Sequence, residues 1–420
     1  MAKKLEDVLT RVERHLIRPV SPWYAMLDGF CHLSKNLYNH ANYLVRSKFI
    51  SEGLWLRYKD MDQILKHDST YSDYKAMPTA QSAQQVLRLL DKNWKAFFST
   101  IRDWQEHKKK YLGRPKLPKY KPRDGKFILV MTNQNCKLKN GEIIFPKIFN
   151  GFKVVPAFMG DEDKAERFCT FQQVRFIPYD RNIVMEIVYT LKSVIQEEDN
   201  GRYAGIDIGV DNLLTMATNT GNAPLIINGK IPKSVNQFYN KERSYWQSIC
   251  MMTTGRYSSV RLNKLADKRN RRIDDYMHKA SRLIINECIK QKISAIVVGK
   301  NKEWKQNSKL SKRVNQHFVQ IPFARLIRMI EYKAKEKGIA VILTEESYTS
   351  GTSFLDGEAP TKENYDKNRR VHRGLFKAND GRVINADVNG AFQIMKKVFP
   401  NVTADGIEDV VLRPVVVVAA

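Results

Sequence analysis

The chain has 420 residues, enough for two to four structural units, and its hydrophobic fraction of 43% is ordinary for folded cores. Its 71 Lys and Arg against 44 Asp and Glu give a formal charge of +27, which favours nucleic acid as the partner over an anionic membrane. Five scattered cysteines without a CxxC pair argue against a disulfide framework or a thiolate zinc site, and the lack of a signal or membrane-spanning run predicts a cytoplasmic protein, associated with the nucleoid when bound to DNA.

Two amphipathic helices are predicted in the first quarter of the chain. Apolar residues recur at three- and four-residue spacing over about 30–46 and again over about 80–106. The apolar faces predict a helical bundle that packs its own core.

A basic segment follows at 107–126. It holds nine Lys or Arg against one acid, with three prolines and two tyrosines interleaved, so a helix cannot persist here. An extended basic strip with aromatic side chains can follow a sugar–phosphate backbone, whereas a plain linker needs neither feature. The predicted nucleic-acid-binding residues of this strip are Lys108, Lys109, Lys110, Arg114, Lys116, Lys119, Tyr120 and Lys121.

The pattern then changes to short strands over about 126–192. Asn140-Gly141 predicts a tight hairpin turn, and a second turn is expected near Asp180. These runs predict a small antiparallel barrel, and the acidic stretch at 196–202 predicts its boundary.

From Tyr203 onward the chain reads as α/β. Strand-like runs occur at 203–209, 213–218, 224–227, 294–299 and 340–346, and helical patterns occupy about 235–290, 317–337 and 385–398. Within the long helical stretch, 256–272 carries seven basic residues against one acid. A solvated charged face is the alternative to nucleic-acid contact for this set, which comprises Arg256, Arg261, Lys264, Lys268, Arg269, Arg271 and Arg272.

Two aspartates are the first candidates for chemistry. Asp207 lies near the end of an apolar strand followed by a glycine turn and a second strand, as in the opening hairpin of a ribonuclease-H fold. Asp387 lies in the first turn of an amphipathic helix, where helix capping is the alternative explanation. Together, beside a strongly basic surface, they predict a two-metal phosphodiester site.

Two hard cations usually need a third carboxylate. The expected fourth strand ends in Gly299, with Glu303 displaced into the loop, whereas the fifth strand ends in Glu345 and Glu346. Adjacent strands lie about 4.8 Å apart, so a glutamate of the fifth strand can reach the same metal. We choose Glu346, because strand alternation turns Glu345 to the opposite face, and keep Glu303 as the second choice.

These segments resemble the TnpB proteins, transposon-encoded ancestors of the type V CRISPR effector nucleases. The likeness runs through GIDIGVDNLLTMAT, QIPFARLIRMIEYKAKEKGI, ESYTS and NADVNGAFQI, and extends to MLDGFCHLSKNLYNHANYLVR and GRPKLPKYKPRDG near the N-terminus. It therefore covers nearly the whole chain.

The resemblance implies a multidomain α+β fold: a small antiparallel wedge β-barrel with an inserted helical recognition lobe, then an α/β ribonuclease-H-like (RuvC) domain. The implied boundaries are 1–28 and 107–200 for the wedge, 29–106 for the lobe, 201–350 and 385–420 for the RuvC domain, and 351–384 for a degenerate zinc-ribbon-like loop.

The sequence departs from the family at two places. Most members carry the catalytic glutamate where Gly299 stands, but some TnpB-like and Fanzor proteins place it just before YTS, which matches Glu346. The usual zinc-ribbon cysteines are replaced by Ser353, Asp356, Lys377 and Asp380, so no structural zinc is expected. The basic residues of this loop that could touch nucleic acid are Lys367, Arg369, Arg370, Arg373 and Lys377.

The function implied is that of an RNA-guided DNA endonuclease, which binds a guide RNA, recognises a short target-adjacent motif in double-stranded DNA and cleaves with two Mg²⁺ or Mn²⁺ ions held by Asp207, Glu346 and Asp387. Base pairing with the RNA would select the target. A homodimer sharing one RNA is left open. The alternatives are a nuclease-inactive, repressor-like RNA-guided protein and a guide-independent nuclease or nucleic-acid-binding protein.

Overall fold

The computed structural model describes residues 8–70, 72–194, 198–300, 319–372, 374–403 and 406–419. The chain divides into two compact units, Met1–Ser193 and Val194–Ala420, and each is treated by itself. Among the described residues, no helix is both long and apolar enough to cross a membrane.

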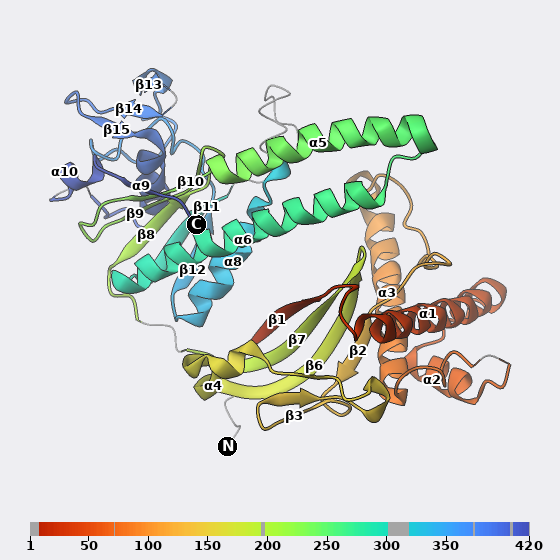
Figure 1. The fold of residues 1–420 in the computed structure, drawn as a ribbon. Helices are drawn as coiled ribbons and strands as arrows, with labels where there is room; N and C mark the ends of the chain where they lie inside the picture. Colours follow the sequence, from red (N-terminus) through yellow and green to blue (C-terminus); the bar gives the residue numbers. More distant parts are fainter. Residues whose placement is uncertain are drawn as a thin grey trace. The chain divides into compact units, whose positions relative to one another are not determined.

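The first unit is built on a four-stranded antiparallel sheet (Figure 1). Its order is β1 (Val8–Ile17), β7 (Asn182–Lys192), β6 (Phe168–Tyr179) and β2 (Leu129–Thr132). The β6–β7 hairpin turns at Asp180, whose φ of 51° is a left-handed conformation that aspartate tolerates. The turn predicted near Asp180 is therefore confirmed.

A separate three-stranded sheet consists of β3 (Lys137–Lys139), β4 (Glu142–Ile144) and β5 (Lys153–Val154). Its first turn is Asn140-Gly141, as predicted, with both φ angles positive. A short helix, α4 (Glu162–Arg167), precedes β6. In the part of the chain that the structure describes, β1 and β2 remain the edges of an open sheet, so strand pairing does not close the expected barrel.

Three helices complete this unit: α1 (Tyr24–Glu52), α2 (Tyr58–His67) and α3 (Ala80–Glu106). The bounds of α3 agree with the predicted helix, and Thr79 caps its N-terminus by accepting a hydrogen bond from the Ser82 N–H at 3.1 Å. The helix predicted over 30–46 is the middle of the longer α1.

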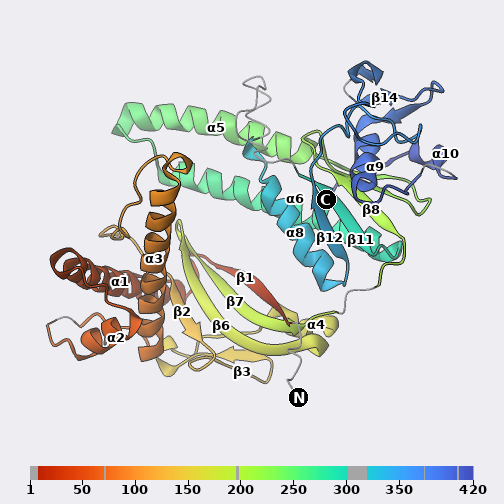
Figure 2. The ribbon, with the colours of Figure 1, turned by 180° about the vertical axis from the view of Figure 1, so that it is seen from behind.

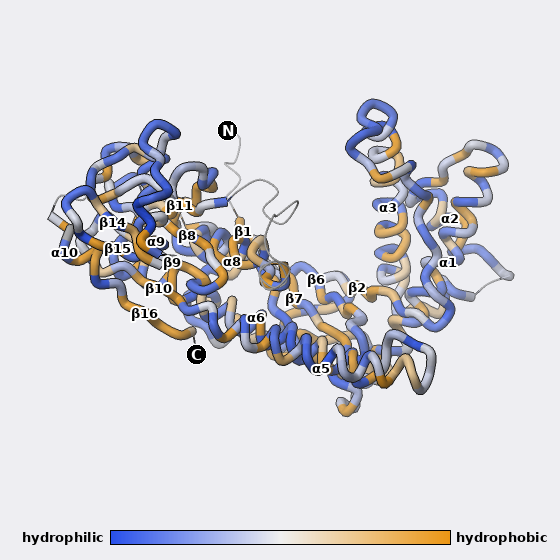
Figure 3. Tube along the Cα trace, turned by 90° about the horizontal axis from the view of Figure 1, so that it is seen from above, coloured by the Kyte–Doolittle hydropathy of each residue, from blue (hydrophilic) through white to orange (hydrophobic). Residues whose placement is uncertain are grey.

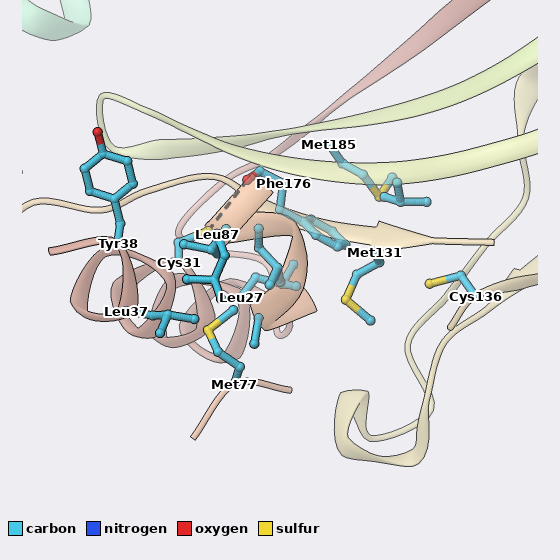
Figure 4. Packing of buried hydrophobic residues seen from close by; sticks show 14 of the residues in the cluster. Leu27, Cys31, Leu37, Tyr38, Met77, Leu87, Met131, Cys136, Phe176 and Met185 are labelled. Carbon is cyan, nitrogen blue, oxygen red and sulfur yellow. Dashed lines mark hydrogen bonds between the residues drawn. The ribbon is translucent and has the colours of Figure 1, made fainter. Parts of the chain in front are cut away.

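The helices and the sheet share one apolar core. Because the helices cover the apolar face of the sheet, that face is buried without closing the strands into a barrel. Figure 4 shows part of this core, where the Cys31 thiol of α1 donates to the Phe176 carbonyl of β6. In the same view the hydroxyl of Tyr38 points away from the cluster.

The second unit contains a six-stranded mixed sheet. Its order is β12 (Ala340–Thr344), β11 (Ala295–Gly299), β8 (Tyr203–Asp207), β9 (Asn212–Thr218), β10 (Leu225–Asn228) and β16 (Val415–Val417). Strands β8, β11 and β12 are mutually parallel, and β9 is antiparallel to both of its neighbours. Figure 3 shows that β8, β9 and β10 are largely hydrophobic, as strands covered on both faces must be.

Helices cover the two faces of this sheet. One apolar cluster joins the sheet to α6 (Val260–Lys290) and α8 (Phe323–Glu336), and another joins it to α9 (Ala386–Val398). Figure 2 shows where these helices lie beside the sheet. Successive residues alternate between the clusters: Ile227 of β10 lies with α6 and α8, and Ile226 lies with α9.

Two expectations about this unit need correction. The helical stretch expected at 235–290 is two helices, α5 (Lys230–Thr254) and α6, because Gly255 adopts a left-handed φ of 63° and ends α5. The expected loop at 351–384 contains strands β13 (Arg370–His372) and β14 (Leu375–Lys377). β14 is the central strand of a three-stranded antiparallel sheet and pairs with β13 on one side and with β15 (Val383–Asn385) on the other. A short helix, α10 (Glu408–Val411), follows α9.

Candidate active site

The first predicted carboxylate, Asp207, is the last residue of β8 and lies on the sheet face covered by α9. Ile206 faces α6 and α8, so Gly205 and Asp207 face the other way by strand alternation. Gly205 makes this packing close, because a Cβ there would collide with the Ala391 carbonyl of α9. The carboxylate of Asp207 also lies against α9: a Cβ added to Gly390 of that helix would be 2.8 Å from Asp207 Oδ2.

The second, Asp387, lies one turn before Gly390 on the same helix. Asn385 caps the helix, and its Oδ1 accepts from the backbone N–H of Asp387 at 3.0 Å, so capping is performed by Asn385 and not by Asp387. The Asp387 side chain instead accepts a hydrogen bond from the amide of Asn212 at 2.7 Å.

Asn212 is a residue that the sequence analysis missed. It begins β9, immediately after the turn that follows Asp207, and its amide fixes the orientation of Asp387 from the neighbouring strand. The only sequence signal was a hydrogen-bonding side chain in the turn of GVDNLL.

The third predicted carboxylate, Glu346, follows β12 and reaches across β11. A Cβ added to Gly299 would lie 2.6 Å from Glu346 Oε1 and 2.7 Å from Glu346 Cγ. The glutamate side chain therefore fills the space directly above Gly299. Glu345 is exposed, and its backbone carbonyl accepts a hydrogen bond from Lys397 Nζ at 2.9 Å. Glu303 lies outside the described residues.

Electrostatics link the three carboxylates. Burial raises the pKa of Asp207 well above its usual value, and the charges of Asp387 and Glu346 raise it further, while Arg370 opposes them. Burial also raises the pKa of Glu346 to about 7, against a smaller opposing effect of Lys397. Negative charge gathered in this way is costly unless a cation compensates it. Even so, within the described ranges no three His, Cys, Asp or Glu side chains are grouped closely enough to form a ready metal-binding cluster.

The basic strip of 107–126 runs along α1 in an extended conformation after a short 3-10 turn at Lys108–Lys110. Side chains on one face of α1 hold its backbone: Asn39 donates to the Lys121 carbonyl at 2.9 Å, and Asn42 donates to the Pro118 carbonyl at 3.0 Å. Most of the predicted basic residues are exposed here, but Lys110 pairs with Asp103. Lys121 is half-buried, with its Nζ 4.9 Å from the ring centroids of both Tyr38 and Phe127.

The second basic set begins just before α6 and continues along that helix. Its exposed members are Arg256, Arg261, Lys264, Lys268, Arg271 and Arg272. Arg261 stacks over Trp246, and Arg271 pairs with Asp267 at 3.1 Å. Arg269 does not share this exposure. It is half-buried and donates to Asn236 at 2.7 Å and to the Gln320 carbonyl at 2.6 Å, so its charge holds the unit together.

Arg369 also has an internal role. Its guanidinium pairs with Asp356 and with Glu358 (2.6 Å) and donates to the Lys377 carbonyl at 3.2 Å, and only 13% of its side chain is exposed. It therefore crosslinks the 351–384 region and does not lie on the exposed basic surface where we had expected it. Lys367, Arg370 and Lys377 remain exposed, and Arg373 lies outside the described residues.

A polar groove of about 600 Å³ in the first unit was not anticipated. It lies between the first turns of α3 and the four-stranded sheet, and carboxamides dominate its lining. The lining side chains with amide or guanidinium groups are Gln81, Gln84, Gln85, Arg88, Asn133, Gln134, Gln172 and Gln173. The sequence signal was the run AQSAQQ, which places glutamines at i, i+3 and i+4 on one helix face.

Comparison with known proteins adds two family matches. Residues 186–305 match a family described as a probable transposase, and residues 323–394 match the TNB domain of Cas12f1-like proteins. A TnpB-like protein of Acidianus two-tailed virus is 24% identical over 403 residues, covering 88% of this chain and 83% of its own. A TnpB-like protein of Methanocaldococcus jannaschii is 25% identical over 166 residues, covering 39% of this chain and 56% of its own.

Solved structures give looser matches. A Cas12f1 chain from a complex with sgRNA and target DNA is 16% identical, with a TM-score of 0.36, covering 92% of this chain and 98% of that chain. A chain of a CRISPR–Cas12f ternary complex is 14% identical, with a TM-score of 0.37, covering 88% of this chain and 81% of that chain.

Proposed function

Because the chain is a member of the TnpB family, we propose that it is an RNA-guided DNA endonuclease whose catalytic residues are Asp207, Glu346 and Asp387. The observation that carries the proposal is the position of Glu346. Its side chain lies above Gly299, on the sheet face where the Asp207 carboxylate meets α9. A glutamate from the segment after β12 thus occupies the space into which a side chain at position 299 of β11 would project.

The strand order of the second unit supports a ribonuclease-H-like (RuvC) assignment for 201–350 and 385–420. A hairpin of β8 and β9 leads to β10, and β11 and β12 add in parallel on the other side of β8. The carboxyl ends of β8, β11 and β12 therefore meet at one edge of the sheet, where Asp207 and Glu346 lie.

Asp207, Glu346 and Asp387 would hold two Mg²⁺ or Mn²⁺ ions, because carboxylate oxygens suit hard cations. Burial raises the pKa of Asp207, and the negative charges of Asp387 and Glu346 raise it further, so a bound cation would relieve this repulsion. When bound, the ions would activate a water and stabilise the leaving oxygen of the scissile phosphate. Asn212 would keep the Asp387 carboxylate oriented, and Lys397 would hold the end of β12 through the Glu345 carbonyl. No structural zinc is proposed, since Arg369 crosslinks the 351–384 region.

The exposed basic surfaces support nucleic acids as the partners of this protein. Exposed lysines of the strip and of α6 would neutralise phosphates of a guide RNA and of its duplex with target DNA. We assign the wedge to 1–28 and 107–200 and the recognition lobe to 29–106. A homodimer of this chain that shares one guide RNA also stays a proposal, and no contact in the described residues is offered in its support.

The polar groove of α3 is the proposed reader of the target-adjacent motif. Glutamine and asparagine amides can pair bidentately with adenine edges in the major groove, and arginine can do the same with guanine. The groove offers both, from Gln84, Gln85 and Arg88 of α3 opposite Asn133 and Gln172 of the sheet region. Readout of paired bases in duplex DNA by the protein would be confined to this motif.

A nuclease-inactive RNA-guided protein is the second candidate. It is favoured by one observation: the third carboxylate is displaced, because β11 ends in Gly299 and Glu346 reaches the site from the segment after β12.

The test is to purify the protein with RNA from its native locus and to add Mg²⁺ and a DNA library that carries a guide-matched target beside random flanks. Cleavage of matched targets beside a preferred flank, lost in Asp207→Ala, is the expected result. Guided binding without cutting in the wild type would favour the inactive protein. If no RNA copurifies, and binding follows only nucleic-acid length and salt, the guided proposal fails.

A further inference from the structure

A second cavity in the first unit, of about 390 Å³, lies where the basic strip crosses α1 and α3. Its volume is within the range of about 300–1,000 Å³ typical of small-molecule sites. Aromatic rings of Tyr38, Phe97 and Tyr120 contribute to its lining, and Lys116 and Lys119 are exposed beside them. We propose that this cavity binds one unpaired nucleobase of a single-stranded nucleic acid, whose adjoining phosphates contact Lys116 and Lys119. The inference rests on the proposed nucleic-acid-binding function and names a site for it.

The lining has the chemistry of a nucleotide site. Phe97 and Tyr120 are at least partly exposed, and such flat rings provide stacking surfaces that accept any base, while lysines beside them attract the backbone. Tyr120 is 44% exposed, so part of its surface is open to a ligand. Among the lining residues that the structure describes, none carries a carboxylate, so an anionic backbone meets no local repulsion.

A hydrogen-bonding group lies inside the cavity as well. Asn93 of α3 donates one N–H to the Tyr38 hydroxyl at 3.1 Å, and both residues line the cavity. Tyr38 is 1% exposed, so this bond fixes the Asn93 amide against a rigid support. The second N–H and the carbonyl of such an amide can pair with the edge of a base.

The wall formed by the strip is held in place before any ligand arrives. Asn39 brackets Lys121, donating to its carbonyl at 2.9 Å and accepting from its N–H at 2.8 Å. Asn42 and Arg46 both donate to the Pro118 carbonyl, at 3.0 and 3.1 Å. A preformed wall lowers the entropy lost on binding.

A base within a duplex does not fit this description, because its faces are stacked and its edge is paired. The ligand is therefore an unstacked base, either of the guide RNA or of a displaced DNA strand. The two sources share base and phosphate chemistry, and they differ in the 2′-hydroxyl.

The test measures binding to full-length protein freed of nucleic acid, so it does not depend on guided cleavage. The probes are oligoriboadenylate, oligodeoxyadenylate, the corresponding duplexes, and an abasic ribose–phosphate oligomer of equal length. Tyr120→Ala is expected to weaken oligoriboadenylate binding about tenfold, a typical loss for a stacking aromatic residue. Tyr120→Phe keeps the ring and should bind as the wild type does. Neither substitution should alter binding of the abasic oligomer.

Lys116→Ala with Lys119→Ala provides the complementary measurement. Because each phosphate contact of a single strand contributes about 0.7 to the slope of log affinity against log salt, this pair should lower the slope by about 1.4 for base-containing and abasic strands alike. The matched control is Lys137→Ala with Lys139→Ala, two exposed lysines of β3, which should leave the slope unchanged. Tyr120→Ala should leave the slope unchanged as well.

The proposal is overturned if Tyr120→Ala weakens the abasic oligomer as much as oligoriboadenylate, or if duplexes show the same dependence on Tyr120. A stronger Tyr120 effect on the ribo-oligomer assigns the base to RNA, and a stronger effect on the deoxy-oligomer assigns it to DNA. If guided cleavage occurs but Tyr120 substitutions do not affect binding, the base-binding site is refuted and the nuclease proposal stands. If Tyr120→Ala weakens binding as expected but no guided cleavage occurs, the base-binding site stands and the nuclease proposal is refuted.

Discussion

Replacement of Gly299 by alanine tests the position of Glu346 most sharply. The added Cβ would lie 2.6 Å from Glu346 Oε1, 2.7 Å from Glu346 Cγ and 2.7 Å from Ile394 Cδ1, all well inside ordinary contact distances. Overpacking of this kind costs about 1–3 kcal/mol. For a unit of this size, each kcal/mol lowers the melting temperature by about 2–4 °C.

The assay is thermal unfolding of four proteins: wild type, Gly299→Ala, Glu346→Ala and the double variant. Truncation of Glu346 removes two of the three close contacts, so Gly299→Ala should be less destabilising in the Glu346→Ala background, with a coupling of about 1 kcal/mol or more. Guided cleavage should fall in Gly299→Ala because Glu346 is displaced. If the alanine lowers the melting temperature equally in both backgrounds, the glutamate does not occupy the space above Gly299.

Three further predictions follow from single interactions. Asn212→Ala should weaken Mn²⁺ binding, measured by calorimetry, because the 2.7 Å hydrogen bond that orients Asp387 is lost; unchanged Mn²⁺ affinity would contradict this role. Arg369→Met should increase protease cleavage within 351–384, since Asp356 and Glu358 lose their partner, and an unchanged cleavage pattern would rule out the crosslink. Burial lowers the pKa of Lys333 to about 8, so between pH 8 and roughly 10.4 the unfolded chain binds more protons than the folded chain, and wild-type stability rises with pH there. The melting temperature of wild type minus that of Lys333→Met should therefore increase from pH 8 to 10, and a pH-independent difference would refute the assignment.

The elements that the sequence predicted well are those with strong periodicity or specific turn residues. The bounds of α3 followed from its apolar spacing, and Asn140-Gly141 required its turn. The break at Gly255 was missed because a helical pattern continues on both sides of it, and one glycine within such a pattern does not by itself end a helix.

The sequence predicted those residues of the candidate site that lie at the ends of strands or at the start of a helix. Asp207, Glu346 and Asp387 follow from strand and helix termini, whereas the Asn212 contact depends on how the turn after β8 places β9 against α9. The internal partners of Arg269 and Arg369 were not foreseen for a related reason. Sequence gives the charge of a residue, but only packing decides whether that charge meets solvent or an internal partner.

The polar groove and the base-sized cavity could not be foreseen, because each joins segments far apart in the chain. The groove combines α3 with residues near β2 and β6, and the cavity combines α1, α3 and the basic strip. Periodicity reports which face of a helix is polar and does not report what lies opposite that face.

The central claim is tested most directly by single-turnover cleavage of a guide-matched linear DNA in Mg²⁺, comparing wild type with Asp207→Ala, Glu346→Gln and Glu345→Gln. Glu345 is the neighbouring, exposed glutamate and serves as the matched control. We predict that Asp207→Ala and Glu346→Gln abolish cutting while guided binding persists, and that Glu345→Gln cuts at the wild-type rate. Wild-type cutting by Glu346→Gln would contradict the account.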